Sequence, residues 1–121
     1  MQDAAKAYRG VARQTASPRE LEADLLHQAA SRLQTVHDSW DGNMAHLDDA
    51  LRYNRKLWTI FLGSITSPDN QLPTEIRQNI ANLGVFIMNQ TMSIMSNPQR
   101  EALAALININ REIAAGLSTK V

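Results

Sequence analysis

The chain of 121 residues has no cysteine, only four prolines and five glycines, and only two each of Trp, Tyr and Phe. The absence of cysteine excludes disulfides, thiol chemistry and thiolate metal sites, and it favours a reducing compartment, so we expect a cytoplasmic protein. The scarcity of proline and glycine leaves long segments in which apolar residues recur at spacings of three and four and never alternate strictly. We therefore expect an all-α chain. The first residues mix charges without an apolar run, which excludes a secretory signal peptide.

Charge is missing from one long stretch, because residues 78–99 contain no Asp, Glu, Lys or Arg. A helix on the outside of a soluble monomer needs a charged face, so this stretch is expected to form a central helix of the fold or to lie against another molecule. Its Asn and Gln side chains argue against a membrane span, since each bare amide in hydrocarbon would cost several kcal/mol. Twelve basic and twelve acidic residues balance overall, so neither nucleic acid nor a membrane surface is favoured by net charge.

Start and stop signals predict four main helices in one small antiparallel bundle that spans residues 1–121. Ser17, Pro18 and Glu20 combine a capping residue, a first-turn proline and a capping-box glutamate. The predicted helices cover residues 18–38, about 44–66, about 73–95 and about 98–116, with Gly63 near the end of the second and Gly116 as a cap of the last. Residues 1–16 have helical propensity but little to bury, so we expect a short N-terminal segment that is mobile or docks only on a partner.

Two asparagines interrupt otherwise apolar heptad seams. Asn54 lies in the middle of a seam on the second predicted helix, and Asn110 lies in the middle of a seam on the last. An amide in such a seam costs stability unless it is bonded, and it commonly fixes the register of the helices or the choice of partner. We expect both side chains to be buried and bonded, either to each other or to backbone carbonyls, and Asn54→Leu to preserve or raise stability by roughly 1 kcal/mol.

The third predicted helix is apolar on a second side. Methionines in that position are more often adaptable core, yet methionine is also favoured where a groove accepts an apolar helix, and both interpretations stay open. The candidate partner-binding residues are Phe86, Met88, Met92, Met95, Tyr53 and Trp58. Such an apolar stripe could also associate with a second copy of the chain, so a homo-oligomer is a further alternative.

Arg52, Arg55 and Lys56 form the only basic cluster, and they are the candidate contacts for RNA. The cluster is narrow for phosphate tracking, and a solvated face paired with Asp48 or Asp49 is the simpler interpretation.

Residues that could carry catalysis or bind a metal are not grouped. His27, His37 and His46 are spaced so that no two share a helical turn, and the chain has neither a phosphate-binding glycine loop nor a nucleophile elbow. We expect no enzyme activity, no metal and no cofactor.

Segments along nearly the whole chain resemble the FlaF family of flagellar biosynthesis regulators of alphaproteobacteria. The matching residues are Tyr8, Pro18-Arg19-Glu20, Glu22, Leu25-Leu26, 50–58 (ALRYNRKLW), Leu72-Pro73, Ile76-Arg77, 79–86 (NIANLGVF) and 109–117 (INREIAAGL). The resemblance implies a small cytoplasmic helical protein needed for flagellin production and export, which works beside FlbT, the partner that restrains flagellin translation. It also suggests a chaperone that binds flagellin directly. It supplies no catalytic residues.

The combined hypothesis is a non-enzymatic flagellin chaperone and regulator. Its uncharged third helix, with the second and fourth, would form an apolar surface for a helical terminal segment of flagellin. The alternative is a regulator that binds flagellin mRNA directly through the basic cluster.

Overall fold

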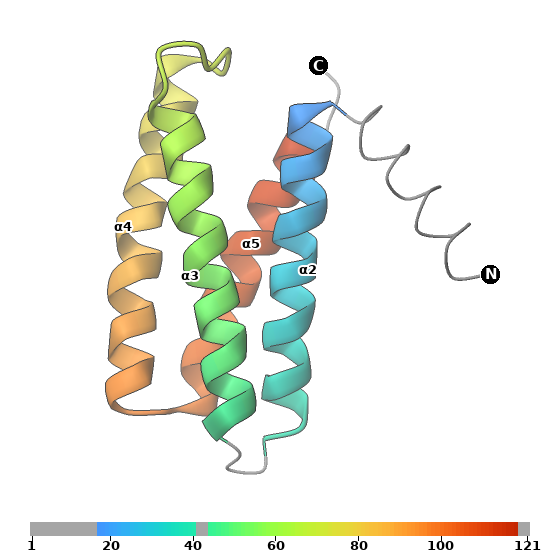
Figure 1. Ribbon diagram of the computed structural model, residues 1–121, viewed down its shortest axis with the longest axis vertical. Coiled ribbons are helices and arrows are strands. Elements are labelled where there is room, and N and C mark those ends of the chain that lie inside the picture. The colour runs from blue at the N-terminus through green and yellow to red at the C-terminus, as the bar shows by residue number, and fades with distance from the viewer. Residues whose placement is uncertain (1–16, 41–43, 119–121) are drawn as a thin grey trace, which may run out of the picture.

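The computed structural model describes residues 17–40 and 44–118, which fold into four antiparallel helices (Figure 1). They are α2 (Pro18–Asp38), α3 (Met44–Thr66), α4 (Thr74–Ser96) and α5 (Leu103–Ser118), and a short 3-10 helix, η1 (Arg100–Ala102), precedes α5. This part of the chain contains no strand, so the predicted all-α helical bundle is confirmed. The N-terminal segment that was predicted for residues 1–16 lies outside the described residues.

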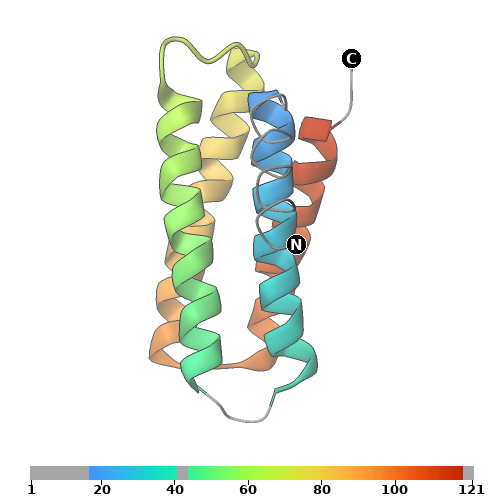
Figure 2. The same cartoon turned by 45° about the vertical axis from the view of Figure 1, so that its right-hand side comes forward.

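The bundle is made of two helix pairs. α2 packs most extensively on α5, whereas α4 packs on α3 and touches α5 only slightly; contacts between α2 and α3 join the pairs. Figures 1 and 2 both show α3 beside α4 and α2 beside α5. The expected central position of the uncharged helix is therefore wrong. α4 lies at an edge of the bundle, because α5 turns to α2 and leaves α4 with one main neighbour.

The helix boundaries agree with the capping signals at the start of α2 and differ at the start of α5. Ser17 Oγ accepts a hydrogen bond from the Glu20 amide at 3.1 Å. The last helix was predicted to begin at about residue 98, but α5 begins at Leu103, and Asn97 terminates α4 with its amide donating to Ser93 O. Helical backbone is disfavoured for a residue that precedes proline, and Asn97 accordingly has φ −143° and ψ 85°.

The core follows the predicted heptad seams with few exceptions. The residues of α3 at heptad spacing from Asn54 are all buried, namely Leu47, Leu51, Trp58, Phe61 and Ile65, while Met44 at the start of the helix is 41% exposed. Gly63 and Gly116 lie within their helices instead of ending them. On α4, Ile76 continues the apolar spacing of the buried residues toward the start of the helix but is 45% exposed. The buried row of α4 consists of Ile80, Gly84, Ile87, Thr91 and Ile94. Thr91 is tolerated there because its hydroxyl donates to Ile87 O at 2.7 Å.

Gly84 marks the closest approach of α4 to α3. A Cβ atom built at this position would lie 2.6 Å from a methyl carbon of Leu62, which is closer than real Cβ atoms come to other heavy atoms. Gly63, which is also inside a helix, has no such neighbour within 4 Å. The lack of a side chain at Gly84 thus lets α4 pack closely on its one main neighbour.

Glu22 carries the one buried carboxylate oxygen without a hydrogen-bond partner among the described residues. Burial raises the pKa of Glu22 above its usual 4.5, and the nearby Arg19 opposes that increase only partly. Glu22 is therefore a half-buried acid that the fold stabilises better in its protonated form.

Candidate partner-binding surface

The three methionines of α4 lie along one flank of the helix. Met88, Met92 and Met95 are spaced by four and three residues, which places them on the same side of an α-helix. Met92 is 56% exposed, while Met88 and Met95 are half-buried at the edge of the core. Of the three methionines that were predicted to contact a partner, Met92 is therefore open to solvent, while Met88 and Met95 also pack against the core.

Phe86 lies on the other flank of α4. Phe86 is 45% exposed. Met92 follows it by six positions, and at 100° per residue this places the two side chains about 120° apart around the helix axis. The predicted grouping of Phe86 with the methionines in one surface is therefore wrong. The spacing of the residues could have shown this, because helix geometry alone determines it.

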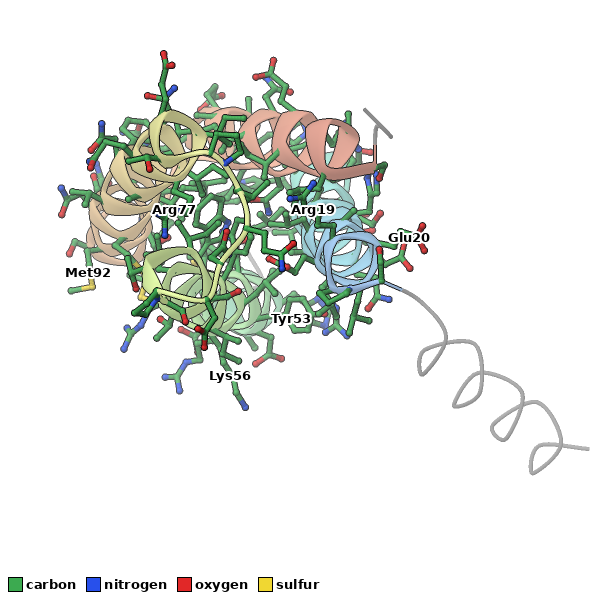
Figure 3. All side chains as sticks on the ribbon, turned by 90° about the horizontal axis from the view of Figure 1, so that it is seen from above. Arg19, Glu20, Tyr53, Lys56, Arg77 and Met92 are labelled. Atoms are coloured by element: carbon green, nitrogen blue, oxygen red, sulfur yellow. The ribbon has the colours of Figure 1, made fainter. Side chains whose placement is uncertain are left out.

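The methionine flank continues into an open groove along α3. The groove has a volume of about 570 Å³, and its lining consists of Arg52, Arg55, Lys56, Thr59, Ile60 and Met95. Figure 3 shows Met92 and Lys56 projecting outward from the same pair of helices. The sequence predicted the methionines and the basic cluster as alternative binding sites, one for a protein partner and one for RNA. In the structure, Met95 and the basic cluster line the same groove.

We define the α3–α4 face as this groove together with the exposed side chains of the methionine flank. Its members are Arg52, Arg55, Lys56, Thr59 and Ile60 of α3, and Val85, Met88, Met92 and Met95 of α4. Ile60 and Val85 were not among the contact residues predicted from the sequence, although they are 63% and 61% exposed. Val85 could have been found, since it precedes Met88 by three residues and Met92 by seven.

The cations of the α3–α4 face differ in their surroundings. Arg52 Nε lies 2.7 Å from Asp48 Oδ2, one helical turn away, as the simpler interpretation of the cluster predicted. Arg55 and Lys56 form no ion pair with any residue that the structure describes. Two exposed positive charges therefore remain available beside the apolar side chains.

Tyr53 points away from the α3–α4 face toward α2. The Arg32 guanidinium lies 4.1 Å from the centre of its ring, and its hydroxyl donates to Gln28 Oε1 at 3.4 Å (Figure 3). The contacts hold Tyr53 against α2 and explain why it does not join the groove.

The prediction that Trp58 contacts a partner is wrong, because its side chain is 0% exposed. Its Nε1 donates to Asn110 Oδ1 at 2.8 Å, and Asn110 Nδ2 donates to Asn54 Oδ1 at 2.6 Å. The predicted burial of the two asparagines is confirmed, and of the two predicted kinds of partner, each other or backbone carbonyls, the structure shows the bond between them. One donor is left over, since Asn54 Nδ2 has no partner among the described residues.

The titratable residues do not assemble into a centre. Among residues 17–40 and 44–118, no three His, Asp or Glu side chains are grouped so that they could hold a metal ion. His37 Nδ1 lies 3.0 Å from Asp38 Oδ1, and hydrogen bonds from His37 and from Gln34 lower the pKa of Asp38. This group sits at the exposed end of α2, away from the α3–α4 face.

The comparisons with known proteins give one match. A family model for the flagellar protein FlaF matches residues 4–117. No curated protein and no solved structure matches the chain. None of the helices that the structure describes is long and apolar enough to cross a membrane.

Proposed function

The chain belongs to the FlaF family of flagellar proteins, and on that premise we propose that it binds flagellin in the cytoplasm as an export chaperone. In this proposal it promotes flagellin synthesis and secretion together with the translational regulator FlbT. The helices act by binding, and no catalytic step is assigned to them.

The exposed apolar side of α4 is the observation that supports a binding role. An edge helix would ordinarily present charged residues to water, but residues 78–99 contain none. Instead Val85 and Met92 are more than half exposed there, and Ile60 of α3 extends the same face. The gathering of several exposed apolar side chains on one face supports an interaction site there.

A helical segment from an end of flagellin fits such a face. Flagellin termini are amphipathic and would aggregate or polymerise early if left bare. Methionine side chains are flexible and polarizable, so a methionine-lined surface adapts to an apolar helix. Covering the segment would keep the subunit soluble, and the occupied chaperone would inform FlbT of the flagellin supply.

A charge at Met92 tests the proposal directly. Met92→Glu should abolish co-elution with purified flagellin while the thermal unfolding followed by circular dichroism stays close to that of the wild type, because the position already sees water. Asn79→Glu is the matched control, since Asn79 is exposed on the opposite flank of α4. Wild-type binding by a folded Met92→Glu variant would contradict the proposal at this site.

Arg55 and Lys56 form no ion pair among the described residues, and this favours a second candidate, direct binding of flagellin mRNA. Salt separates the candidates: three phosphate contacts on single-stranded RNA would lose affinity roughly 20-fold when the salt concentration rises about fourfold, whereas an apolar contact hardly responds. Filter binding of flagellin leader RNA at two salt concentrations measures the first response, and calorimetry with flagellin measures the second.

A second copy of the chain is the remaining alternative occupant. A concentration series by light scattering, with the wild type and Met92→Glu side by side, measures it. A dimer that Met92→Glu dissociates would place the apolar surface in a homo-oligomer.

A further inference from the structure

We propose that the α3–α4 face binds an amphipathic helix whose apolar stripe is edged by carboxylates, and that Arg55 and Lys56 select those carboxylates. The inference deepens the proposed function and rests on it in one respect, namely that the natural helix would be a segment of flagellin. The chemistry of the partner follows from the charges and the apolar side chains of the α3–α4 face.

The charges of the face are complementary to an acidic partner. Arg52 is already neutralised by Asp48, at 2.7 Å, but Arg55 and Lys56 have no ion pair among the described residues. They line one groove with Ile60 and Met95. A partner that buries its apolar side chains in this groove brings its flanking residues next to the two cations, so carboxylates are favoured at its edge.

The dimensions of the face match a short helix. At 1.5 Å per residue, positions 52–60 of α3 extend over about 12 Å and positions 85–95 of α4 over about 15 Å, or roughly three helical turns. Met88, Met92 and Met95 repeat at the spacings by which a docked helix presents its own anchors. A helix of about 11 residues therefore covers the face.

The surroundings of the cations favour a peptide over RNA. Tyr53, the aromatic residue next to the cluster in sequence, is held against Arg32 and Gln28 of α2 and offers no platform for a base. The remaining lining is Thr59, Ile60 and Met95. The Thr59 hydroxyl already donates to Arg55 O at 2.8 Å, and the apolar Ile60 and Met95 give phosphates nothing to bond.

A swap of charge preference tests the inference. The probes are two synthetic peptides of roughly 18 residues with the same apolar stripe at positions i, i+3, i+4 and i+7, edged by glutamates in one and by lysines in the other. The proteins are the wild type, the double variant Arg55→Glu/Lys56→Glu, and Arg111→Glu as a control on the exposed side of α5. Fluorescence anisotropy gives the affinities, and circular dichroism verifies that every variant is folded.

The wild type should bind the glutamate-edged peptide about tenfold more tightly than the lysine-edged one. The double variant should reverse that preference, and Arg111→Glu should keep it. Equal affinities in the wild type, or an unchanged preference in the double variant, would overturn the inference. It would also fail if an RNA oligonucleotide bound and neither peptide did, or if neither peptide bound and Met92→Glu converted a dimer into monomers.

Purified flagellin separates this inference from the proposed function. If the wild type binds the glutamate-edged peptide with the reversible preference but does not bind flagellin, the function is wrong and the chemistry of the face stands. If flagellin binds the wild type and the double variant equally well, the chaperone function stands and the selection by Arg55 and Lys56 is wrong.

Discussion

Two regions of the molecule reverse the usual distribution of polar and apolar side chains. In the seam between α3 and α5, Asn54 and Asn110 are 0% exposed, whereas on the α3–α4 face Ile60 and Val85 are more than 60% exposed. Each reversal costs free energy in an isolated chain. The regions differ in where the compensation lies. Within the seam the amides bond to each other and to Trp58, whereas Ile60 and Val85 stay exposed in the part of the chain that the structure describes.

The difference separates a structural feature from a functional one. A buried polar chain whose main contacts are internal fixes how α3 and α5 meet, and it should respond to mutation through stability. An apolar surface without an internal partner should respond through binding.

Asn110→Leu should cause the largest loss of stability, roughly 2–4 kcal/mol. The substitution removes the acceptor of Trp58 Nε1 and the donor to Asn54 Oδ1 in one step, and it leaves both groups buried without a partner. Urea unfolding followed by circular dichroism measures the change. A variant as stable as the wild type would mean that the seam does not depend on its polar chain.

Asn54→Leu is the companion to this substitution and should stay within about 1 kcal/mol of the wild type. It deprives Asn110 Nδ2 of its acceptor, but it also removes the Asn54 Nδ2 donor, which already lacks a partner. One unsatisfied group replaces another. The stability of Asn54→Leu should therefore exceed that of Asn110→Leu, and the opposite order would contradict the bonding described for the seam.

Gly84→Ala and Gly63→Ala should have opposite effects of about 1 kcal/mol. Alanine at Gly63 meets no atom within 4 Å and should stabilise α3 through its higher helix propensity. At Gly84 the new methyl group would meet Leu62 at 2.6 Å, so the free-energy cost of moving α4 away from α3 should exceed the gain in helix propensity. Thermal melts compare the pair. Equal stabilisation by both variants would show that close packing of α4 on α3 is dispensable.

Met92→Glu should change the free energy of unfolding by less than about 0.5 kcal/mol, since more than half of the side chain is in water already. The same urea titration that is applied to the seam variants measures it. Met88→Glu should be more damaging, because Met88 is half-buried against the core. Unfolding of Met92→Glu would place this position in the core and remove the contrast between the two regions.

Glu22→Gln should give a small gain in Tm at pH 7 that disappears below about pH 4. The pKa of Glu22 is raised from 4.5 in the folded state, so the native protein holds this proton more tightly than the unfolded chain does. Stability is thus lost as the pH rises through the raised pKa, and glutamine avoids that loss. Glu20→Gln, at an exposed position in the first turn of α2, is the control and should bring no gain.

The seam could be predicted from the sequence, and the position of α4 could not. Asn54 and Asn110 occupy equivalent central places in heptad patterns, which predicted that both are buried and bonded but left open whether they bond each other or backbone carbonyls. The absence of charge in residues 78–99 is equally typical of a central helix and of an exposed binding helix, because the spacing of residues records which side of a helix is apolar but not what covers it. Close packing of α5 on α2 decides the matter, and it depends on tertiary contacts.

Aromatic residues show the same limit. Tyr53 and Trp58 are similar as sequence signals, since both lie on the second predicted helix near the basic cluster. Trp58 belongs to the heptad seam and is buried, whereas Tyr53 lies one position before Asn54 and faces α2. Heptad membership could have assigned Trp58 to the core, but the contact of Tyr53 with Arg32 depends on the neighbouring helix.

The most extensive helix contact in the described chain joins α2 to α5, the elements farthest apart along it. Closing the chain around two intervening helices costs entropy that only the completed contact repays, so this pairing is expected to come late in folding. The α3–α4 hairpin needs only its short connection and can form first. During synthesis α2 must then wait for α5 to leave the ribosome, and for that interval the apolar side of α2 is open to chaperones and to other nascent chains.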